Sequence, residues 1–90
     1  VDFYADWCIP CKELDALTFS DPQVLNEFER FTVYKVDMTK NNDTNEQLRQ
    51  RFNVIGMPTV IIIDSKGNEI KRLTGFVNAD EFLSFVKDVK

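Results

Sequence analysis

The chain has 90 residues, 43% hydrophobic and 29% charged, which is typical of one globular domain with a small core. It has two cysteines and no histidine, which excludes nucleophiles activated by histidine and leaves too few ligands for a zinc site within one chain. The net charge of −4, from 11 basic and 15 acidic residues, and the lack of a basic stripe argue against a nucleic-acid partner.

The chain begins with a short strand that leads into a helix. Val1 to Ala5 is apolar apart from one aspartate, which is typical of a buried strand. A loop follows over Trp7 to Cys11, and we expect a helix from Pro10, because proline suits the first helical turn. Leu14 and Leu17, three residues apart, mark the buried side of this helix.

A second helical segment follows an interruption at Thr18 to Pro22. Either Ser20 or Asp21 caps it, and Gln23 would complete a capping box from Ser20. Its apolar residues continue at helical spacing, as Val24, Phe28 and Phe31.

The middle of the chain predicts a strand and a short helix. Thr32 to Asp37 alternates and is rich in strand formers, and Lys40 to Thr44 is a polar loop. Glu46 to Phe52 reads as a helix that is buried through Leu48 and Phe52.

The last third predicts a hairpin and a helix. Thr59 to Ile63 is a β-branched run typical of a strand covered on both faces. Ser65 to Asn68 forms a turn into a strand over Glu69 to Thr74. Asn78 with Glu81 is a capping signal for the last helix, whose apolar stripe is Phe82, Phe85, Val86 and Val89.

The order β-α-β-α-β-β-α predicts an α/β fold, with a central mixed sheet flanked by helices. Residues 1–90 show no repeat or linker, so we expect a single monomeric domain. The longest apolar run, Val60 to Ile63, is far shorter than the about 20 residues of a membrane span, so we expect the domain itself to be soluble. No signal peptide is visible, and the abrupt apolar start suggests a fragment of a larger protein.

Cys8 and Cys11 lie where a strand meets a helix, in the string Trp-Cys-Ile-Pro-Cys. A helix N-terminus favours a thiolate, and cysteine pKa values in such motifs fall from about 8.5 into a range of about 3.5–7.5. Cys8, outside the first turn, is expected to be the accessible nucleophile, and Cys11 the resolving thiol of a disulfide-exchange cycle. The alternatives are a stapling disulfide, which would stabilise so short a loop by only about 2 kcal/mol, and half of a zinc site shared by two chains.

Two carboxylates are candidates for proton handling at these thiols. Asp2 interrupts an apolar strand, and a buried carboxylate there would have a raised pKa and could take the proton of Cys11. Asp15 lies four residues after Cys11 on the same helix face. The alternatives are a solvated Asp2 at the chain end and an Asp15 that is an ordinary exposed acid.

Acidic neighbours oppose the effect of the helix on the nucleophile. Asp6, Glu13 and Asp15 all lie near the pair in sequence. We therefore predict a pKa for Cys8 that is only modestly lowered, or even raised, which suits a reductant better than a strong oxidant. A thiol titration that gives Cys8 a pKa below about 5 would contradict this.

Two further segments could contact a partner. Pro58 enters the third strand, where a cis bond is plausible in a tight turn, the alternative being an ordinary trans strand start. Trp7 beside a reactive thiol is either a contact surface or a core aromatic.

The motifs Trp-Cys-x-x-Cys-Lys after an apolar strand and Met-Pro-Thr before a second strand resemble the thioredoxin superfamily. The resemblance covers essentially the whole chain and lacks that fold's usual first strand and helix. A closer likeness is to the C-terminal periplasmic domains of the DsbD family of transmembrane disulfide reductases. It rests on residues 1–8, 11–13, 18–24, 53–59 and 74–76, of which Thr-Phe-Ser-Asp-Pro at 18–22 is the most discriminating.

The resemblance implies a thiol-disulfide oxidoreductase without a cofactor. Such domains accept electrons from the membrane-embedded part of the same protein and pass them to its N-terminal periplasmic domain, which serves disulfide isomerases and cytochrome c maturation. The likeness assigns attack to Cys8 and resolution to Cys11. Asp2 and Asp15 match two acidic positions near the thiols.

The likeness also assigns residues to partner binding. Pro58 matches a cis-proline, and Met57 the residue whose backbone pairs with a partner's chain. Two departures bear on the redox potential: the Ile9-Pro10 pair is more like thioredoxin, and Asp15 is one methylene shorter than the expected Glu.

Three functions follow as candidates. The first is an electron relay on the periplasmic side of the bacterial inner membrane, as a domain of a membrane protein. The second is a free-standing thioredoxin-like reductase of protein disulfides, for which a cytoplasmic location is the alternative. The third is a non-catalytic binding module with this fold, against which the intact cysteine pair argues.

Overall fold

The computed structural model describes residues 1–89 of the chain. The order of its elements confirms the predicted β-α-β-α-β-β-α arrangement, with the first helical region divided in three. The elements are β1 (Asp2–Tyr4), α1 (Ile9–Glu13), η1 (Leu14–Thr18), α2 (Pro22–Phe28), β2 (Lys35–Asp37), α3 (Asp43–Phe52), β3 (Thr59–Ile63), β4 (Glu69–Thr74) and α4 (Ala79–Val86).

The four strands form one mixed sheet in the order β2-β1-β3-β4. β1 and β2 are parallel, as expected of a βαβ unit, and their register pairs Asp2 with Lys35. β3 runs antiparallel to both β1 and β4. The short β1 therefore lies in the middle of the sheet, and its C-terminal end points the chain toward the cysteine pair.

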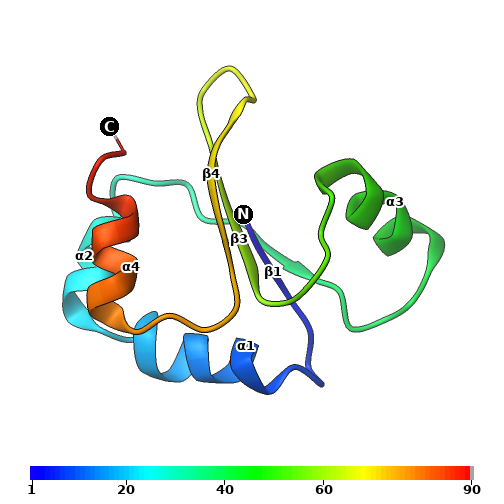
Figure 1. Ribbon diagram of the computed structural model, residues 1–90, viewed down its shortest axis with the longest axis horizontal. Coiled ribbons are helices and arrows are strands. Elements are labelled where there is room, and N and C mark those ends of the chain that lie inside the picture. The colour runs from blue at the N-terminus through cyan, green and yellow to red at the C-terminus, as the bar shows by residue number, and fades with distance from the viewer. Residues whose placement is uncertain (90) are drawn as a thin grey trace.

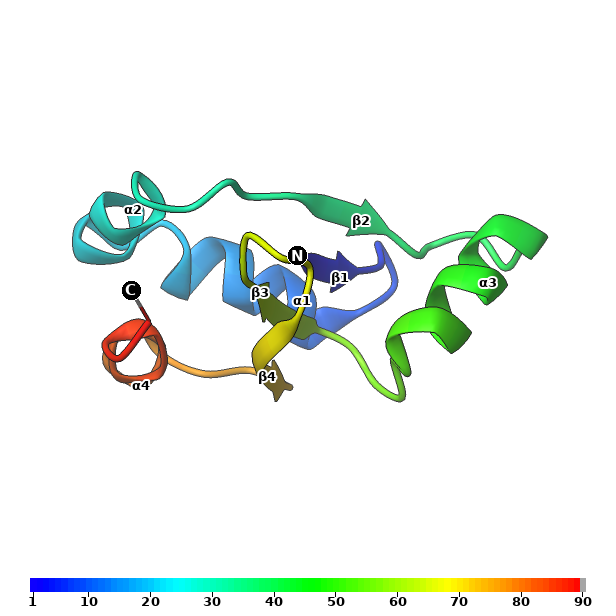
Figure 2. The same ribbon diagram turned by 90° about the horizontal axis from the view of Figure 1, so that it is seen from above.

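Helices cover both faces of the sheet. Figures 1 and 2 show α1, α2 and α4 on one side and α3 on the other. Alternate residues of β3 pack on opposite faces of the sheet, because successive side chains of a strand point to opposite faces. Val60 and Ile62 join the cluster under α2 and α4, whereas Ile61 joins the cluster under α3. The prediction that β3 is covered on both faces is confirmed.

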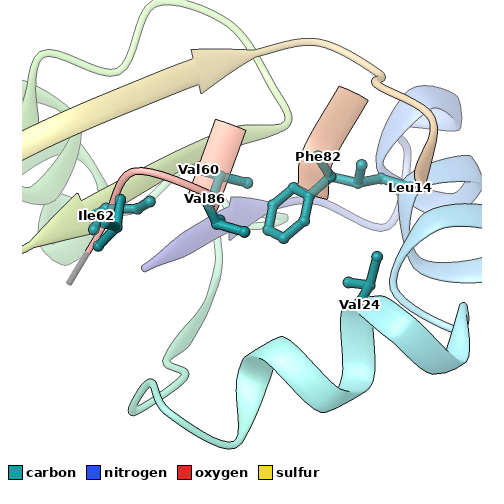
Figure 3. Close-up of a cluster of buried hydrophobic side chains, with 7 residues drawn as sticks. Leu14, Val24, Val60, Ile62, Phe82 and Val86 are labelled. Carbon is teal, nitrogen blue, oxygen red and sulfur yellow. The ribbon is translucent and has the colours of Figure 1, made fainter. Parts of the chain in front are cut away.

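The larger core lies between the sheet and α2 and α4 (Figure 3). Phe82 of α4 is 2% exposed, and its ring lies edge-on to Phe19 and Phe28 at centroid distances of 5.3 and 5.7 Å. Edge-to-face aromatic pairs at this spacing add to the stability that area burial gives. The cluster also contains Leu14, Val24, Val60, Ile62, Val86 and Val89.

The first helix differs from its prediction at both ends. It begins at Ile9 rather than Pro10. After Glu13 it continues as the π-helical turn η1, in which the Phe19 N–H donates to the Leu14 carbonyl at 2.9 Å. In a wider turn the residue four positions on, rather than three, stays on the same face. Thr18 is accordingly buried with Leu14, and the prediction that Leu17 is buried is wrong, since it is 63% exposed.

The structure decides between the two predicted caps of α2. Asp21 is the cap, and its carboxylate accepts hydrogen bonds from the backbone N–H of Gln23 and Val24. Ser20 forms no capping box, because its hydroxyl donates to the Ala16 carbonyl instead. α2 ends at Phe28, so Phe31 lies beyond the helix but still packs against the larger core.

Two predicted boundaries in the middle of the chain are wrong. The strand predicted over 32–37 is reduced to β2. α3 begins three residues earlier than predicted, because the Asn42 side chain accepts the N–H of Asn45 and caps it. Leu48 and Phe52 of α3 are half-buried and pack on the second cluster, as expected.

The C-terminal elements follow their predictions closely. β3 and β4 have the predicted bounds. Asn78 and Glu81 form the predicted capping box, in which each side chain accepts a hydrogen bond from the other residue's backbone N–H. Within residues 1–89 no helix is long and apolar enough to cross a membrane.

Candidate functional site

Cys8 and Cys11 form a disulfide at the start of α1, with their Cα atoms 5.2 Å apart. Cys8 is the N-cap, and its Sγ accepts a hydrogen bond from the Cys11 N–H at 3.2 Å. A helix N-terminus has unpaired backbone donors that stabilise negative charge, so this position favours a thiolate at Cys8 after reduction. In the disulfide form the two residues are equally buried at 5% exposure. The expected greater accessibility of Cys8 is therefore not found in this form.

Asp2 lies in β1, one of the two central strands of the sheet. It is buried, and one carboxylate oxygen, Oδ1, has no hydrogen-bond partner among the described residues. The pKa of Asp2 is raised to about 6, mainly because the carboxylate is buried; the charge of Lys35 lowers this pKa and the charge of Asp15 raises it. The buried interpretation of Asp2 is confirmed, and the solvated alternative is wrong.

Lys35 joins the two predicted carboxylates, and the sequence analysis missed it. Its Nζ lies 2.9 Å from Asp15 Oδ2, and it pairs with Asp2 in the parallel register of β1 and β2. The same Nζ lies 4.9 Å from the centre of the Tyr4 ring. Burial lowers the pKa of Lys35, but the hydrogen bond and charge of Asp15 outweigh it and the pKa rises. One feature of the sequence could have indicated Lys35: it lies in the predicted strand 32–37, which a βαβ arrangement places beside the strand that contains Asp2.

Trp7 projects from the loop before the disulfide. It is 63% exposed, which excludes the core interpretation. Its indole Nε1 donates to the Thr39 carbonyl at 3.3 Å, and the Asp6 N–H donates to the Thr39 hydroxyl at 2.9 Å. The Asp37 carboxylate accepts from both the N–H and the hydroxyl of Thr39. The loop after β2 thus holds the indole beside the cysteines.

The loop before β3 closes the other side of the disulfide. The Met57–Pro58 bond is cis, as predicted, and Pro58 is buried. Met57 packs against the cluster of Ala5, Cys8 and Cys11. The structure therefore brings Met57, Pro58 and the cysteine pair together.

Two exposed isoleucines belong to the same segments: the sequence singled out Ile9 only as part of the Ile9-Pro10 pair, and it did not single out Ile55. Ile9, between the cysteines, is 70% exposed, and Ile55, two residues before Met57, is 87% exposed. Both side chains are therefore available for contact with a partner, on the two segments that contain the cysteine pair and the cis-proline. The available signal was a branched apolar residue within the first motif, at Ile9, and another two residues before the second motif, at Ile55.

The described residues offer little for a metal. Within positions 1–89 no group of three or more Cys, Asp or Glu side chains is arranged to hold an ion. The two sulfurs are bonded to each other, whereas a zinc ligand must be a thiolate. The arrangement instead suits two-electron exchange between thiols and a disulfide.

Comparison with known families supports the same chemistry. The sequence matches the family model described as a thioredoxin-like domain over residues 1–90. It is 51% identical over 89 residues to the thiol:disulfide interchange protein DsbD of Haemophilus influenzae strain PittEE, which covers 97% of this chain and 15% of that protein. The DsbD of Pasteurella multocida is 44% identical over 92 residues, covering 100% of this chain and 16% of that protein. The chain thus spans about 15% of the length of such relatives.

Solved structures give the same result. The chain resembles the oxidised C-terminal domain of DsbD from Neisseria meningitidis with a TM-score of 0.86 and 37% identity, covering 99% of this chain and 77% of that one. A thioredoxin from Thermus thermophilus follows at a TM-score of 0.82 and 28% identity, covering 98% of this chain and 69% of that one.

Proposed function

Because the chain belongs to the thioredoxin-like domain family, and within it to the group of DsbD C-terminal domains, we propose that it relays electrons by disulfide exchange from a transmembrane domain to a partner domain in the periplasm. The observation that carries this proposal is the Cys8–Cys11 disulfide at the start of α1, against which Met57 packs. The immediate substrates are protein disulfides, and both thiols of the cycle come from this chain.

The exchange proceeds in two steps. In the reduced protein the Cys8 thiolate attacks a sulfur of the partner's disulfide, which forms a mixed disulfide and releases the partner's other sulfur as a thiolate. Cys11 then loses its proton and attacks Cys8 Sγ, which forms the Cys8–Cys11 bond and breaks the mixed disulfide. The partner gains two electrons from this chain and takes up two protons.

Asp2 is the proposed acceptor of the Cys11 proton. Its raised pKa of about 6 makes it ionised at neutral pH yet much more basic than an ordinary aspartate, whose pKa is about 3.9. Such a carboxylate can take a proton and return it near neutral pH. Lys35 lowers the pKa of Asp2 and Asp15 raises it, and these two residues form an ion pair with each other.

Reduction of insulin disulfides, followed as turbidity, tests the enzymatic part of the proposal. We expect the wild-type protein with dithiothreitol to reduce insulin and the Cys8→Ser variant to be inactive, because the attacking sulfur is gone. Full activity of Cys8→Ser would contradict both redox functions and leave the binding module.

A trapping experiment separates the relay from a free-standing reductase. A Cys11→Ser variant lacks the resolving thiol, so its mixed disulfide with the partner should persist. Adducts with a polypeptide that contains membrane spans, identified by mass spectrometry, would support the relay. Adducts with soluble proteins only would favour the free-standing reductase.

A further inference from the structure

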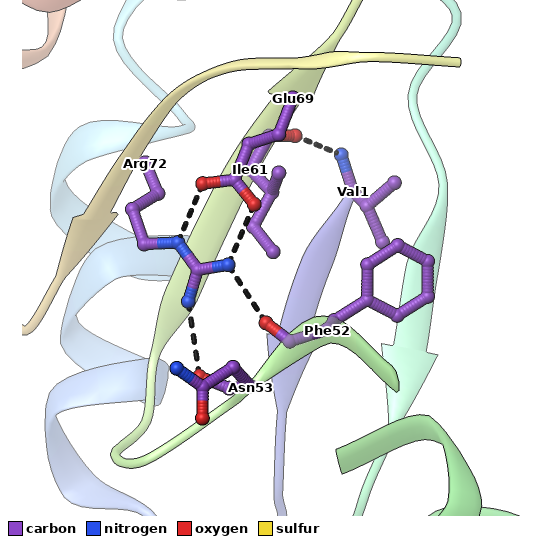
Figure 4. Close-up of polar contacts among 6 residues, drawn as sticks. All are labelled: Val1, Phe52, Asn53, Ile61, Glu69 and Arg72. Carbon is purple, nitrogen blue, oxygen red and sulfur yellow. Dashed lines mark hydrogen bonds and ion pairs between the residues drawn. The ribbon is translucent and has the colours of Figure 1, made fainter. Parts of the chain in front are cut away.

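Arg72 links β4 to the end of α3, away from the cysteine pair. Its guanidinium donates to the carbonyl oxygens of Phe52 at 2.7 Å and Asn53 at 3.0 Å (Figure 4). The last carbonyls of a helix have no partner within it. Asn53 also leaves the helix in the left-handed conformation, with φ of 52°. A side chain from the sheet therefore holds the chain where it departs from α3.

Glu69 fixes the orientation of this guanidinium. Its carboxylate accepts from Arg72 Nε at 2.7 Å and from Nη2 at 2.6 Å, and these bonds lower the pKa of Glu69. Residues three apart in a regular strand point to opposite faces. A bulge in β4, where Ile62 and Ile63 pair with Lys71 and Glu69, inserts one extra residue and brings Glu69 to the face of Arg72.

The residue directly after β4 holds the other end of the same loop. The Gly75 N–H, three residues after Arg72, donates to the Pro58 carbonyl at 2.8 Å. Between these two anchors runs the segment 53–58, which contains the exposed Ile55 and the Met57 that packs against the cysteines. The position of Met57 beside the disulfide therefore depends on both anchors.

We propose that Arg72 is a positioning residue for disulfide exchange, which holds the 53–58 loop in the form on which a partner polypeptide docks. This inference rests on the proposed function. The hydrogen bonds of Arg72 go to Phe52, Asn53 and Glu69, not to the cysteines. Its loss therefore weakens productive docking of a protein substrate far more than it changes the reactivity of the sulfurs toward a small disulfide.

The test compares a protein disulfide with a small one. For Arg72→Ala we expect kcat/KM toward insulin to fall about tenfold, mainly through KM, because the charge-assisted hydrogen bonds to the last carbonyl of α3 and to the first carbonyl of the loop are lost. The rate with 5,5′-dithiobis(2-nitrobenzoate), which reaches the sulfurs without resting on the loop, stays within about twofold. Arg51→Ala is the matched control, since it removes the same charge from the end of α3, where Arg51 lies over the Phe52 ring.

A conservative variant keeps the test valid if Arg72→Ala folds poorly. Arg72→Lys retains the charge and much of the aliphatic chain but cannot reproduce the planar guanidinium with its several donors. It should therefore show most of the increase in KM that is expected for Arg72→Ala. Amide hydrogen exchange gives an independent readout: Val54, whose N–H donates to the Arg49 carbonyl at 2.9 Å, should exchange faster in both Arg72 variants, while amides of β3 stay protected.

The two hypotheses fail in different ways. If both Arg72 variants reduced insulin with the kcat and KM of the wild-type protein, the positioning role would be overturned and the redox function would stand. The same holds if kcat/KM fell equally with insulin and with the small disulfide. A wild-type protein that reduces neither substrate would contradict the proposed function. In that case unchanged exchange at the Val54 amide would separately overturn the anchoring by Arg72.

Discussion

At the scale of single residues, the site depends on a buried acid whose charge is only partly compensated. Asp2 has one carboxylate oxygen without a hydrogen-bond partner among residues 1–89, and its pKa is raised to about 6. Lys35 opposes this rise but is shared with Asp15, which it contacts directly. The sequence predicted both acids and missed the lysine, because strand register rather than local pattern brings Lys35 to Asp2.

Replacing Asp2 tests the cost of burying its charge. An acid whose pKa is higher in the folded than in the unfolded state stabilises the fold at pH values below its ordinary pKa near 4, and this contribution is lost as the pH rises through about 6. Asp2→Asn should therefore increase the free energy of unfolding at pH 7, by up to about 3 kcal/mol, and flatten its decline between pH 4 and 6. Urea unfolding across this range measures the effect.

The exposed Asp6 provides the control for that measurement. Asp6→Asn removes a charge from the neighbouring loop and should leave the decline in stability between pH 4 and 6 in place. A decline that persists in Asp2→Asn would show that Asp2 is not its source.

Removing the Lys35 charge should raise the pKa of Asp2 further. Lys35 lowers that pKa, and without it Asp15 also loses its counter-charge. An NMR titration that follows the Asp2 carboxyl carbon should give a midpoint at higher pH in Lys35→Gln than in the wild type. Lys40→Gln, an exposed lysine of the next loop, is the control, and an unchanged Asp2 transition in Lys35→Gln would refute the coupling.

At the scale of elements, local signals predicted the parts of the chain that local interactions decide. The β-branched run of β3, the turn after it and the Asn78–Glu81 cap each depend on residues only a few positions apart in the sequence. The start of α3 was missed because Asn42 caps it from within a polar run that reads as a loop. The π-helical turn η1 was missed for a different reason: its Thr18 hydroxyl donates to the Val77 carbonyl, 59 residues away.

The two leucines of η1 give a direct test of this turn. Leu14 is 1% and Leu17 63% exposed. Leu14→Ala should lower the free energy of unfolding by about 2–5 kcal/mol, as large-to-small changes in a core do. Leu17→Ala should change it by less than about 0.5 kcal/mol. Equal losses in urea unfolding would mean that the helix keeps the α-helical face predicted from its sequence.

At the scale of the whole molecule, two helical layers hold a four-stranded sheet from both sides, and the disulfide lies at the start of one helix. The order of elements was enough to predict the parallel pair and the hairpin. It did not predict that β4 and the residue after it would hold both ends of the loop that carries Met57. That arrangement needs a bulge and a hydrogen bond between distant residues, and neither has a signature in the sequence.

Reduction of the disulfide should leave the fold largely stable. A bond that closes a loop of so few residues limits the unfolded chain only slightly, so its loss should cost at most about 2 kcal/mol. Urea unfolding with and without dithiothreitol measures the difference. Unfolding of the reduced protein at neutral pH without denaturant would favour the stapling disulfide over a redox role.

The placement of Trp7 has a practical consequence. It is the single tryptophan of the chain, it precedes Cys8 directly, and its indole is held by the Thr39 carbonyl. Disulfides quench an excited indole at close range, whereas thiols do so less. We therefore expect the emission of Trp7 to change when the neighbouring disulfide is reduced, which would let the emission follow the oxidation state of the cysteine pair in real time without a label.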